Sequence, residues 1–303
     1  MSKLSLGPVG VALNVSADDT YLKEAAEAEQ LGYSAIWLPG GQIDSLDRIA
    51  KIVGATKSVP VVPGIIPLDV YRADAVVRLY AQLQASAPDR FVVGLGGPQQ
   101  PRPLRPLGDY LDELDRAEPP VPAGRRILAA LGPRKLELAR DRAAGAVALL
   151  VTPGYTRQAR RVLGGQPTLV INQMLVLDTD AARARQAARV PLSFLSGVSG
   201  YRANFARMGF TGRDVADLSD RLVDELVVWG SADKITARIS AHLDAGADQV
   251  ALTVLNSGGQ PGPIDVAREL AGRLPAGLRP GHDAGDPGHD AGDPGHDDGD
   301  GVR

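Results

Sequence analysis

Short apolar runs and amphipathic segments alternate along most of this 303-residue chain, and this alternation constrains the fold more than any single motif. Eight runs predict strands: residues 6–13, 34–39, 60–66, 90–95, 126–131, 146–151, 168–177 and 249–255. The segments between them predict helices, such as 18–31, which ends at Gly32, and 133–144, which begins at Pro133. Eight strands alternating with helices predict an α/β fold of the TIM (β/α)8 barrel type.

A doubly wound open sheet is the alternative architecture. It places a glycine-rich turn after its first strand, whereas residues 14–18 contain no GxGxxG pattern. We therefore predict a barrel over residues 1–276. After its seventh strand we expect a helical insertion, about 178–229, that contains no strand. Residues 277–303 repeat Gly, His, Asp and Pro, and we expect this tail to be disordered and without function.

Composition excludes several classes of function. Cysteine is absent, so thiol chemistry and disulfides are excluded. No apolar run reaches the ~18 residues of a membrane span, and no signal peptide is visible, so a cytoplasmic protein is expected. The net charge of −3 comes from the tail, because residues 280–303 hold seven Asp and one Arg. The remainder has only a small positive excess and no basic patch interleaved with aromatics, so we expect no nucleic-acid partner.

The carboxyl ends of barrel strands, where active sites of this fold lie, carry Gly, Ala and Pro in this chain. The clearest cases are DRFVVGLGG, residues 89–97, and ILAALGPRKLELARDRAAG, residues 127–145. Strand tips without side chains let a flat ligand lie against backbone amides. Paired carboxylates and a metal cage are missing, and His242 is expected to be a surface or half-buried helix residue. A bound cofactor is therefore expected to supply the chemistry.

Residues 152–156 (TPGYT) join the sixth predicted strand to a helix. Their hydroxyls and the free amides at the helix start are suited to a phosphate group. An ordinary N-cap by Thr152 is the alternative interpretation.

The segments 35–39 (AIWLP), 90–96 (RFVVGLG), 129–139 (AALGPRKLELA) and 150–156 occur in an order and spacing that resemble one known family. Segments 219–230 and 242–250 add to the similarity. Together they resemble the bacterial luciferase-like superfamily, and within it the branch that depends on the deazaflavin F420. The resemblance extends over residues 7–275, and the long insertion after strand seven is also typical of that family.

The resemblance implies hydride transfer between F420 and a small organic substrate, in a protein that forms homodimers. It implies a non-proline cis peptide bond near the end of strand three that supports the ring. The cofactor-binding residues it implies are Gly64, Ile65, Ile66, Gly94, Gly96, Gly97, Ala130, Gly132, Thr152, Gly154, Tyr155, Thr156 and Gln173. The expected catalytic residues are Gln99, Trp37 and Tyr201. A core position for Trp37, and an internal network for Asn172 and Gln173, are the alternatives.

Three positions depart from the family pattern, because Gly40, Pro67 and Gln99 stand where relatives often carry acidic, Asn and His residues. All three remove polar or titratable groups, and glutamine cannot exchange a proton near neutral pH. Two alternatives therefore stay open. One is an FMN-dependent monooxygenase of the same superfamily. The other is a barrel that has lost flavin binding and acts as a cofactor-free enzyme or as a binding or dimerisation protein.

Overall fold

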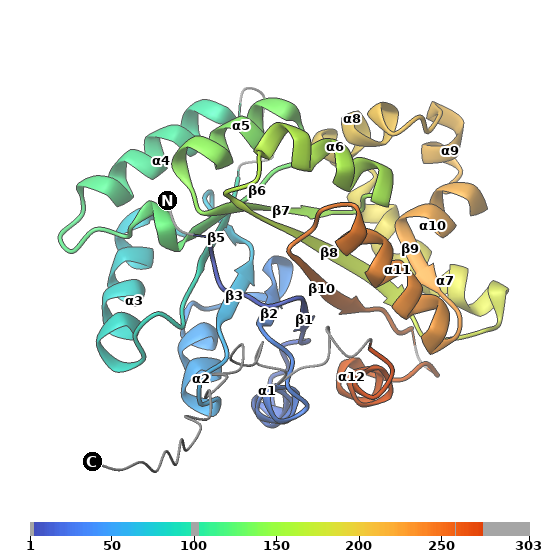
Figure 1. Cartoon of the computed structure of the whole chain (residues 1–303), viewed down its shortest axis with the longest axis horizontal. Coiled ribbons are helices and arrows are strands. Elements are labelled where there is room, and N and C mark those ends of the chain that lie inside the picture. Colours follow the sequence, from blue (N-terminus) through green and yellow to red (C-terminus); the bar gives the residue numbers. More distant parts are fainter. Residues whose placement is uncertain (1–2, 98–102, 258, 275–303) are drawn as a thin grey trace, which may run out of the picture.

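The computed structural model describes residues 3–97, 103–257 and 259–274, and its strands form one closed parallel barrel (Figure 1). The strand order is β3-β2-β1-β10-β8-β7-β6-β5-β4, with β9 paired to β8. Only Ile65 separates β3 from β4, and β3 also meets the β5 side through a parallel bridge between Val61 and Phe91. The strands are β1 Val9–Ala12, β2 Ile36–Pro39, β3 Val61–Gly64, β4 Ile66–Pro67, β5 Val93–Gly96, β6 Arg126–Ala129, β7 Gly145–Leu149, β8 Thr168–Val176, β9 Val227–Trp229 and β10 Gln249–Val254. Counting β3 and β4 as one strand, and leaving out β9, gives the predicted eight-stranded barrel.

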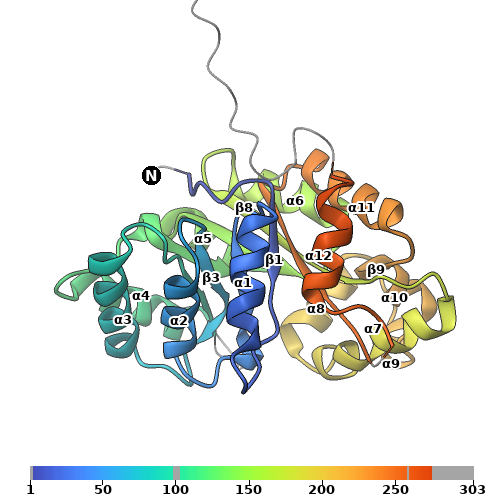
Figure 2. The same ribbon diagram turned by 90° about the horizontal axis from the view of Figure 1, so that it is seen from below.

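Helices follow the strands and cover the outside of the barrel, and Figure 2 shows α1, α2 and α12 on this outer surface. They are α1 Thr20–Gln30, α2 Asp47–Ala55, α3 Ala73–Ser86, α4 Leu104–Arg116, α5 Pro133–Arg142, α6 Pro153–Leu163, α11 Ala232–Asp244 and α12 Pro263–Ala271. Two 3-10 turns, η1 Gly40–Gln42 and η2 Ala123–Arg125, complete this part of the chain. None of the helices described is long and apolar enough to cross a membrane.

Side chains alternate along each strand between the barrel interior and the layer under the helices. One buried cluster fills the interior, and it includes Trp37, Val62, Ile127 and Val170. A larger cluster packs the opposite faces of the strands against the helices. The side chain of Trp37 is 0% exposed, and its Nε1 donates to Oε1 of Gln249 at 2.8 Å. The expectation of a core Trp is therefore met.

The insertion contains four helices: α7 Ala181–Leu195, α8 Ser199–Arg207, α9 Gly212–Ala216 and α10 Asp220–Leu226. They form their own apolar cluster with the end of β8. The prediction that this segment holds no strand is wrong, because its end forms β9. The reason lies in β8, whose residues 174–176 extend past the pairing with β7, and β9 pairs with this extension.

The helix between the third and fourth predicted strands, α3, begins only at Ala73. The chain first continues as β4 and then turns, with the amides of Val70 and Tyr71 both donating to the carbonyl of Pro67. Val70, which lies in this turn, is 65% exposed as a result.

Candidate functional site

The mouth of the barrel, at the carboxyl ends of the strands, has an apolar surface made by neighbouring strands. The peptide bond between Gly64 and Ile65 is cis, at the position that the family resemblance implied. The Ile65 side chain lies over Gly96, where a Cβ would come within 2.5 Å of its Cγ1. The same Cβ would lie 3.2 Å from Cβ of Ala129. Because Ile65 and Ala129 are both partly exposed, they present an apolar surface at the mouth.

Packing within the chain explains several of the glycines at this rim. A Cβ on Gly94 would lie 1.8 Å from the carbonyl oxygen of Pro63, and one on Gly97 would lie 2.6 Å from Cδ1 of Leu68. On Gly64 it would lie 3.1 Å from the Trp37 ring. The interpretation that these tips are bare in order to admit a ligand is therefore corrected: the chain's own groups occupy the space. Whether Gly64, Ile66, Gly94, Gly96 and Gly97 contact a cofactor stays a prediction.

Gly132 and Gly154 differ from those glycines, because the space beside each is open. Within 4 Å a Cβ on Gly132 would meet only the guanidinium of Arg207, whose Nη2 would be 3.6 Å away, and one on Gly154 would meet only Oγ1 of Thr152. Gly132 caps α5, and Gly154 lies in the first turn of α6. The amides of Arg134 and Gly154 donate to none of the residues that the structure describes. Two neighbouring helix starts thus keep free N–H groups beside open space.

Thr152 and Tyr155 shape the start of α6. Oγ1 of Thr152 accepts from the amide of Tyr155 at 3.2 Å, so Thr152 is an N-cap, the alternative left open by the sequence. The Tyr155 hydroxyl donates to the carbonyl oxygens of Leu131, at 2.9 Å, and Ala130, at 3.2 Å. Burial raises the pKa of Tyr155. This side chain therefore holds the end of β6 against α6 and stays protonated at neutral pH.

Two of the predicted cofactor-binding side chains, Thr156 and Gln173, face away from the barrel interior, which corrects their expected placement. Adjacent residues of a strand point to opposite faces, so Asn172 and Gln173 cannot both enter the barrel. Gln173 lies under the helices, where its Nε2 donates to the carbonyl oxygens of Met174 and Leu226. Thr156 is fully buried and contacts His242.

His242 is 0% exposed, so the expectation of a surface or half-buried residue is wrong. Its Nδ1 lies 2.8 Å from Oγ1 of Thr156, and its Nε2 lies 2.9 Å from Oε1 of Gln173. Desolvation, with a smaller contribution from the Arg238 charge, lowers the pKa of His242 to about 3. The ring is therefore neutral at physiological pH.

Of Asn172 and Gln173, Asn172 is the one whose side chain points into the barrel interior, because the faces of a strand alternate. Oγ1 of Thr253, on the neighbouring strand β10, donates to Oδ1 of Asn172 at 2.6 Å. The side-chain nitrogen of Asn172, Nδ2, donates to none of the described residues, so it can donate to a ligand. The pattern of alternation could have selected Asn172 over Gln173 from the sequence.

Arg207 comes from the insertion and was not among the predicted residues. Its Nη2 donates to Oδ1 of Asn204 at 3.1 Å, and no carboxylate of the described chain lies within ion-pair distance. The next residue, Met208, accepts from the Thr152 hydroxyl at 4.0 Å, so the end of α8 lies beside the start of α6. Lys135, in the first turn of α5, is half-buried and has neither an ion pair nor a side-chain hydrogen bond within the described ranges. Desolvation lowers the pKa of Lys135.

Of the three predicted catalytic residues, the structure describes Trp37 and Tyr201, which belong to different apolar clusters. Trp37 lies inside the barrel core. Tyr201, on α8, is partly buried against Phe205, with ring centroids 6.3 Å apart, and desolvation raises its pKa to about 12. Gln99 lies outside the described residues. Their roles stay predictions.

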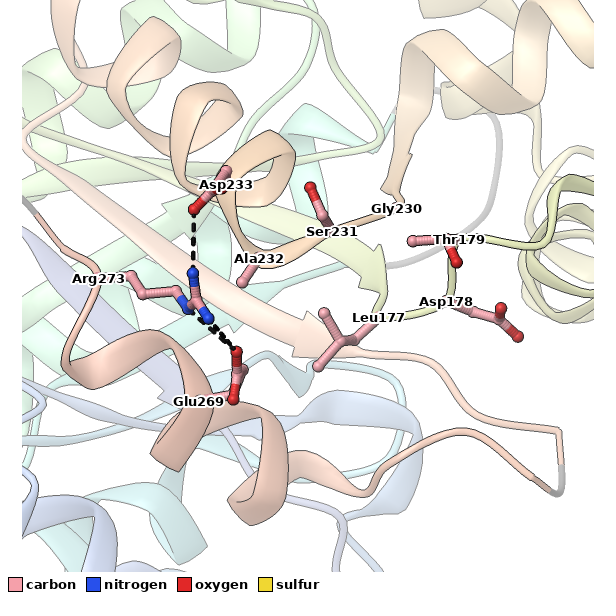
Figure 3. Close-up of a pocket in the computed structure, with 9 residues that line it drawn as sticks. All are labelled: Leu177, Asp178, Thr179, Gly230, Ser231, Ala232, Asp233, Glu269 and Arg273. Carbon is pink, nitrogen blue, oxygen red and sulfur yellow. Dashed lines mark hydrogen bonds and ion pairs between the residues drawn. The ribbon is translucent and has the colours of Figure 1, made fainter.

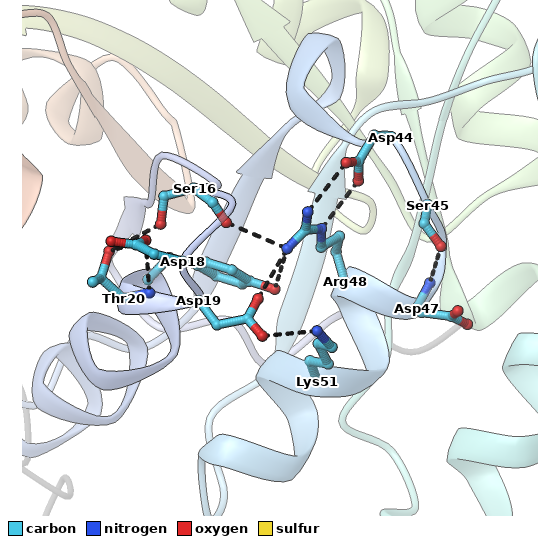
Figure 4. A network of polar contacts seen from close by, with 10 residues as sticks. Ser16, Asp18, Asp19, Thr20, Asp44, Ser45, Asp47, Arg48 and Lys51 are labelled. Atoms are coloured by element: carbon cyan, nitrogen blue, oxygen red, sulfur yellow. Dashed lines mark hydrogen bonds and ion pairs between the residues drawn. The ribbon is translucent and has the colours of Figure 1, made fainter.

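The opposite side of the mouth, after β1 and β2, carries a polar network (Figure 4). Arg48 donates to both carboxylate oxygens of Asp44, at 3.0 and 3.1 Å, and to Asp19 at 2.9 Å. Lys51 donates to the second oxygen of Asp19 at 2.8 Å. Hydrogen bonds from Lys51 and Arg48 lower the pKa values of Asp19 and Asp44 respectively. Both cations here are neutralised.

A surface cavity of about 420 Å³ lies beyond the ends of β8 and β9 (Figure 3). Arg273 lines it and bonds to Asp233, at 3.3 Å, and to Glu269. It contains none of the predicted site residues. Within the described ranges, no cluster of His, Asp or Glu is arranged to hold a metal ion.

No protein-family model and no curated protein matches the chain. Solved structures do match. One is an F420-dependent secondary alcohol dehydrogenase with an F420–acetone adduct, at a TM-score of 0.69 and 15% identity, over 92% of this chain and 100% of that one. A coenzyme F420-dependent tetrahydromethanopterin reductase from Methanopyrus kandleri matches at a TM-score of 0.61 and 15% identity, over 90% of this chain and 98% of that one. A third match is the oxygenating constituent of 3,6-diketocamphane monooxygenase from Pseudomonas putida, a type II Baeyer-Villiger monooxygenase in complex with FMN. Its TM-score is 0.64 and its identity 13%, over 88% of this chain and 99% of that one.

This chain shares its fold with those three enzymes. The likeness confirms the predicted barrel architecture. Because one relative holds F420 and another holds FMN, the shared fold does not distinguish between the two cofactors.

Proposed function

We propose that this protein is an F420-dependent oxidoreductase that transfers a hydride between the deazaflavin and a small organic substrate. One observation supports it most strongly: Arg207, a cation without a carboxylate partner among the described residues, lies beside two helix starts with free amides and open glycine positions. Helix N-termini attract anions through their amides and dipoles. A guanidinium adds a strong, charge-assisted donor.

In this proposal the phosphate arm lies between Gly132 on α5, Thr152 and Gly154 on α6, and Arg207 on α8. The residues fit such a group, because a Cβ at either glycine would enter space that the chain itself does not fill. The backbone of Ala130 is already bonded within the chain, because its N–H donates to the carbonyl oxygen of Val147 at 3.0 Å and its carbonyl oxygen accepts from Tyr155. Bound F420 would supply the hydride chemistry at its C5.

The ring would lie on the apolar surface of Ile65 and Ala129, over Gly96. Asn172 offers it a hydrogen-bond donor from the opposite wall of the barrel. Of the expected catalytic set, Tyr201 retains partial exposure and a raised pKa, so it is protonated at neutral pH and able to donate. Trp37 supports this surface from the barrel interior, where its ring packs against Gly64.

The number of unpaired cations favours F420 over FMN. Besides Arg207, the first turn of α5 carries Arg134 and Lys135, and the second turn of α6 carries Arg157. None of the three is in an ion pair within the described chain. F420 bears an acidic oligoglutamate tail beyond its phosphate, which these cations would attract. An FMN-dependent monooxygenase is the second candidate, and the match to the FMN complex from Pseudomonas putida favours it.

Titration of the purified protein with F420 and with FMN, followed by cofactor absorbance and fluorescence, tests the proposal. We expect F420 to bind, and Arg207→Gln to weaken it roughly tenfold, as the loss of one charge-assisted hydrogen bond would. Arg213→Gln is the matched control, because Arg213 is an exposed arginine of the same insertion that pairs with Asp217 at 3.3 Å. Binding of FMN alone would replace F420 by the second candidate. Binding of neither cofactor at tens of micromolar would overturn both.

A further inference from the structure

A buried chain of side chains connects the start of α6 to the end of the insertion. Thr156 in the first turn of α6 contacts His242 of α11, which contacts Gln173 of β8. Gln173 in turn donates to the carbonyl oxygen of Leu226, the last residue of α10, at 3.1 Å. All three side chains are at most 1% exposed. The proposed function has no role for this chain of contacts.

The network also fixes the tautomer of the imidazole. The end of the Gln173 amide that faces the carbonyl oxygens of Met174 and Leu226 must be the nitrogen, so Oε1 faces His242 and accepts from it. Nε2 of His242 therefore carries the proton, and Nδ1 accepts from the Thr156 hydroxyl at 2.8 Å. The same hydroxyl lies 3.3 Å from the carbonyl oxygen of Thr152, which is its second acceptor. A neutral ring satisfies both partners, which agrees with its lowered pKa.

One end of the network lies in the helix turn that carries Gly154, and the other end reaches the apolar cluster of the insertion. The amide of Thr156 donates to the carbonyl oxygen of Thr152 at 3.0 Å, which closes the turn that carries Gly154. The end of the insertion packs, through Leu222 and Leu226, in the same apolar cluster as Phe205 of α8. The helix with Phe205 ends at Arg207. The network thus joins the part of the site on α6 to the apolar cluster that carries Arg207.

We propose that His242 is a positioning residue that holds the first turn of α6 in register with the insertion, and so sets the spacing between Gly154 and Arg207. The expected effect of His242 on ligand binding rests on the proposed function. Its expected effect on the first turn of α6 does not. A leucine at this position would fill the same volume. It would leave Oε1 of Gln173 without a partner, and the Thr156 hydroxyl with only its longer bond, 3.3 Å, to the carbonyl oxygen of Thr152. The first turn of α6 would then lose its connection to β8 and open more often.

Three variants test the proposal, with one control. His242→Leu and Thr156→Val break the network from either side, so the second remains informative if the first fails to fold. His242→Gln keeps a donor for Gln173 and serves as the conservative variant. Thr236→Val is the control, because Thr236 lies on the same helix and its hydroxyl donates locally to the carbonyl of Ala232 at 2.8 Å.

Hydrogen exchange of peptides that cover residues 153–157 and 222–227 gives a readout without any cofactor. We expect exchange in both peptides to rise roughly tenfold in His242→Leu and Thr156→Val, to recover in part in His242→Gln, and to stay unchanged in Thr236→Val. Unchanged exchange, or a rise spread evenly over the barrel, would overturn the proposal.

Cofactor titration of the same variants is the second readout. We expect F420 affinity to fall roughly tenfold in Thr156→Val, with the thermal midpoint close to that of Thr236→Val. Unchanged affinity would overturn the effect on the site. If the unaltered protein binds neither F420 nor FMN, the proposed function fails, and the exchange experiment still decides the role of His242.

Discussion

The cationic side chains on one side of the barrel mouth are paired with carboxylates, and those on the other side are not. On the β1–β2 side, Arg48 and Lys51 are bonded to Asp44 and Asp19 (Figure 4). On the β6–β7 side, Arg207 and Lys135 have no carboxylate within ion-pair distance among the residues described. The elements that bear them also differ, since Arg48 and Lys51 both lie on α2, whereas Lys135 lies in the first turn of α5 and Arg207 at the end of α8 in the insertion.

This difference indicates where an anionic ligand belongs. A paired cation has little attraction left for a ligand, because its carboxylate screens it and must first be displaced. An unpaired cation beside free amides loses little on binding an anion. The β1–β2 network therefore stabilises loops, and the β6–β7 side is the part of the mouth available for recognition.

The largest expected effect comes from filling the open space on the β6–β7 side. Gly154→Leu places a side chain where the structure has only Oγ1 of Thr152 within 4 Å, so the fold tolerates it. We expect F420 affinity to fall about a hundredfold or more. Gly54→Leu, at an exposed site of α2 with no neighbouring atom within 4 Å, is the control. If Gly154→Leu binds the cofactor normally in calorimetric titration, the anion site lies elsewhere.

Acid is expected to weaken the β6–β7 side before the β1–β2 side. The folded-state pKa of His242, about 3, lies below its usual value of 6.5, so the unfolded chain takes up this proton first. Stability is then fully present above pH 6.5 and falls toward the folded pKa, at about 1.4 kcal/mol per pH unit. Asp19 and Asp44 have lowered pKa values, so their contribution is lost only in more acidic solution.

Urea unfolding at pH 7, 5.5 and 4.5 measures this effect. We expect the unaltered protein to lose about 2–3 kcal/mol between pH 6.5 and 4.5, and His242→Gln to lose much less over the same range. Equal pH dependence of the two proteins would contradict a buried neutral imidazole.

Arg48→Gln and Arg207→Gln form a reciprocal pair of variants. Arg48→Gln removes the bidentate bond to Asp44 and the bond to Asp19, so it should lower the free energy of unfolding and leave F420 affinity unchanged. Loss of Arg207, an exposed side chain with one hydrogen bond, should leave stability nearly unchanged and weaken binding. Unfolding and titration data on both variants check the assignment, which an effect of Arg48→Gln on affinity would contradict.

Local sequence patterns were sufficient to locate the eight barrel strands, because each strand is an apolar run between helical segments. They could not locate β9. Its three residues form a strand because β8 is longer than β7, which is a property of two segments far apart in the sequence.

The site was predicted less completely, for two different reasons. The burial of His242 had a local signal in the sequence, since Ile235, Ile239 and His242 follow the i, i+4, i+7 spacing of one buried helix face. Arg207 had no such signal, because α8 reaches Gly132 only through the tertiary packing of the insertion. The glycines of β5 were found, but their cause is packing on Pro63, Ile65 and Leu68.

The smallest expected effect, and the one that best separates the two cofactors, is the response to salt. Added salt screens exposed charges beyond about 8–10 Å at physiological ionic strength. Unpaired cations on the β6–β7 side should make F420 affinity fall several-fold between low and high NaCl, and FMN affinity fall less because FMN lacks the acidic tail. The slope of F420 affinity against salt concentration should decrease in Arg207→Gln and stay the same in Arg48→Gln. Equal slopes for F420 and FMN would show that the tail does not reach Arg134, Lys135 and Arg157, and would remove the charge argument for F420.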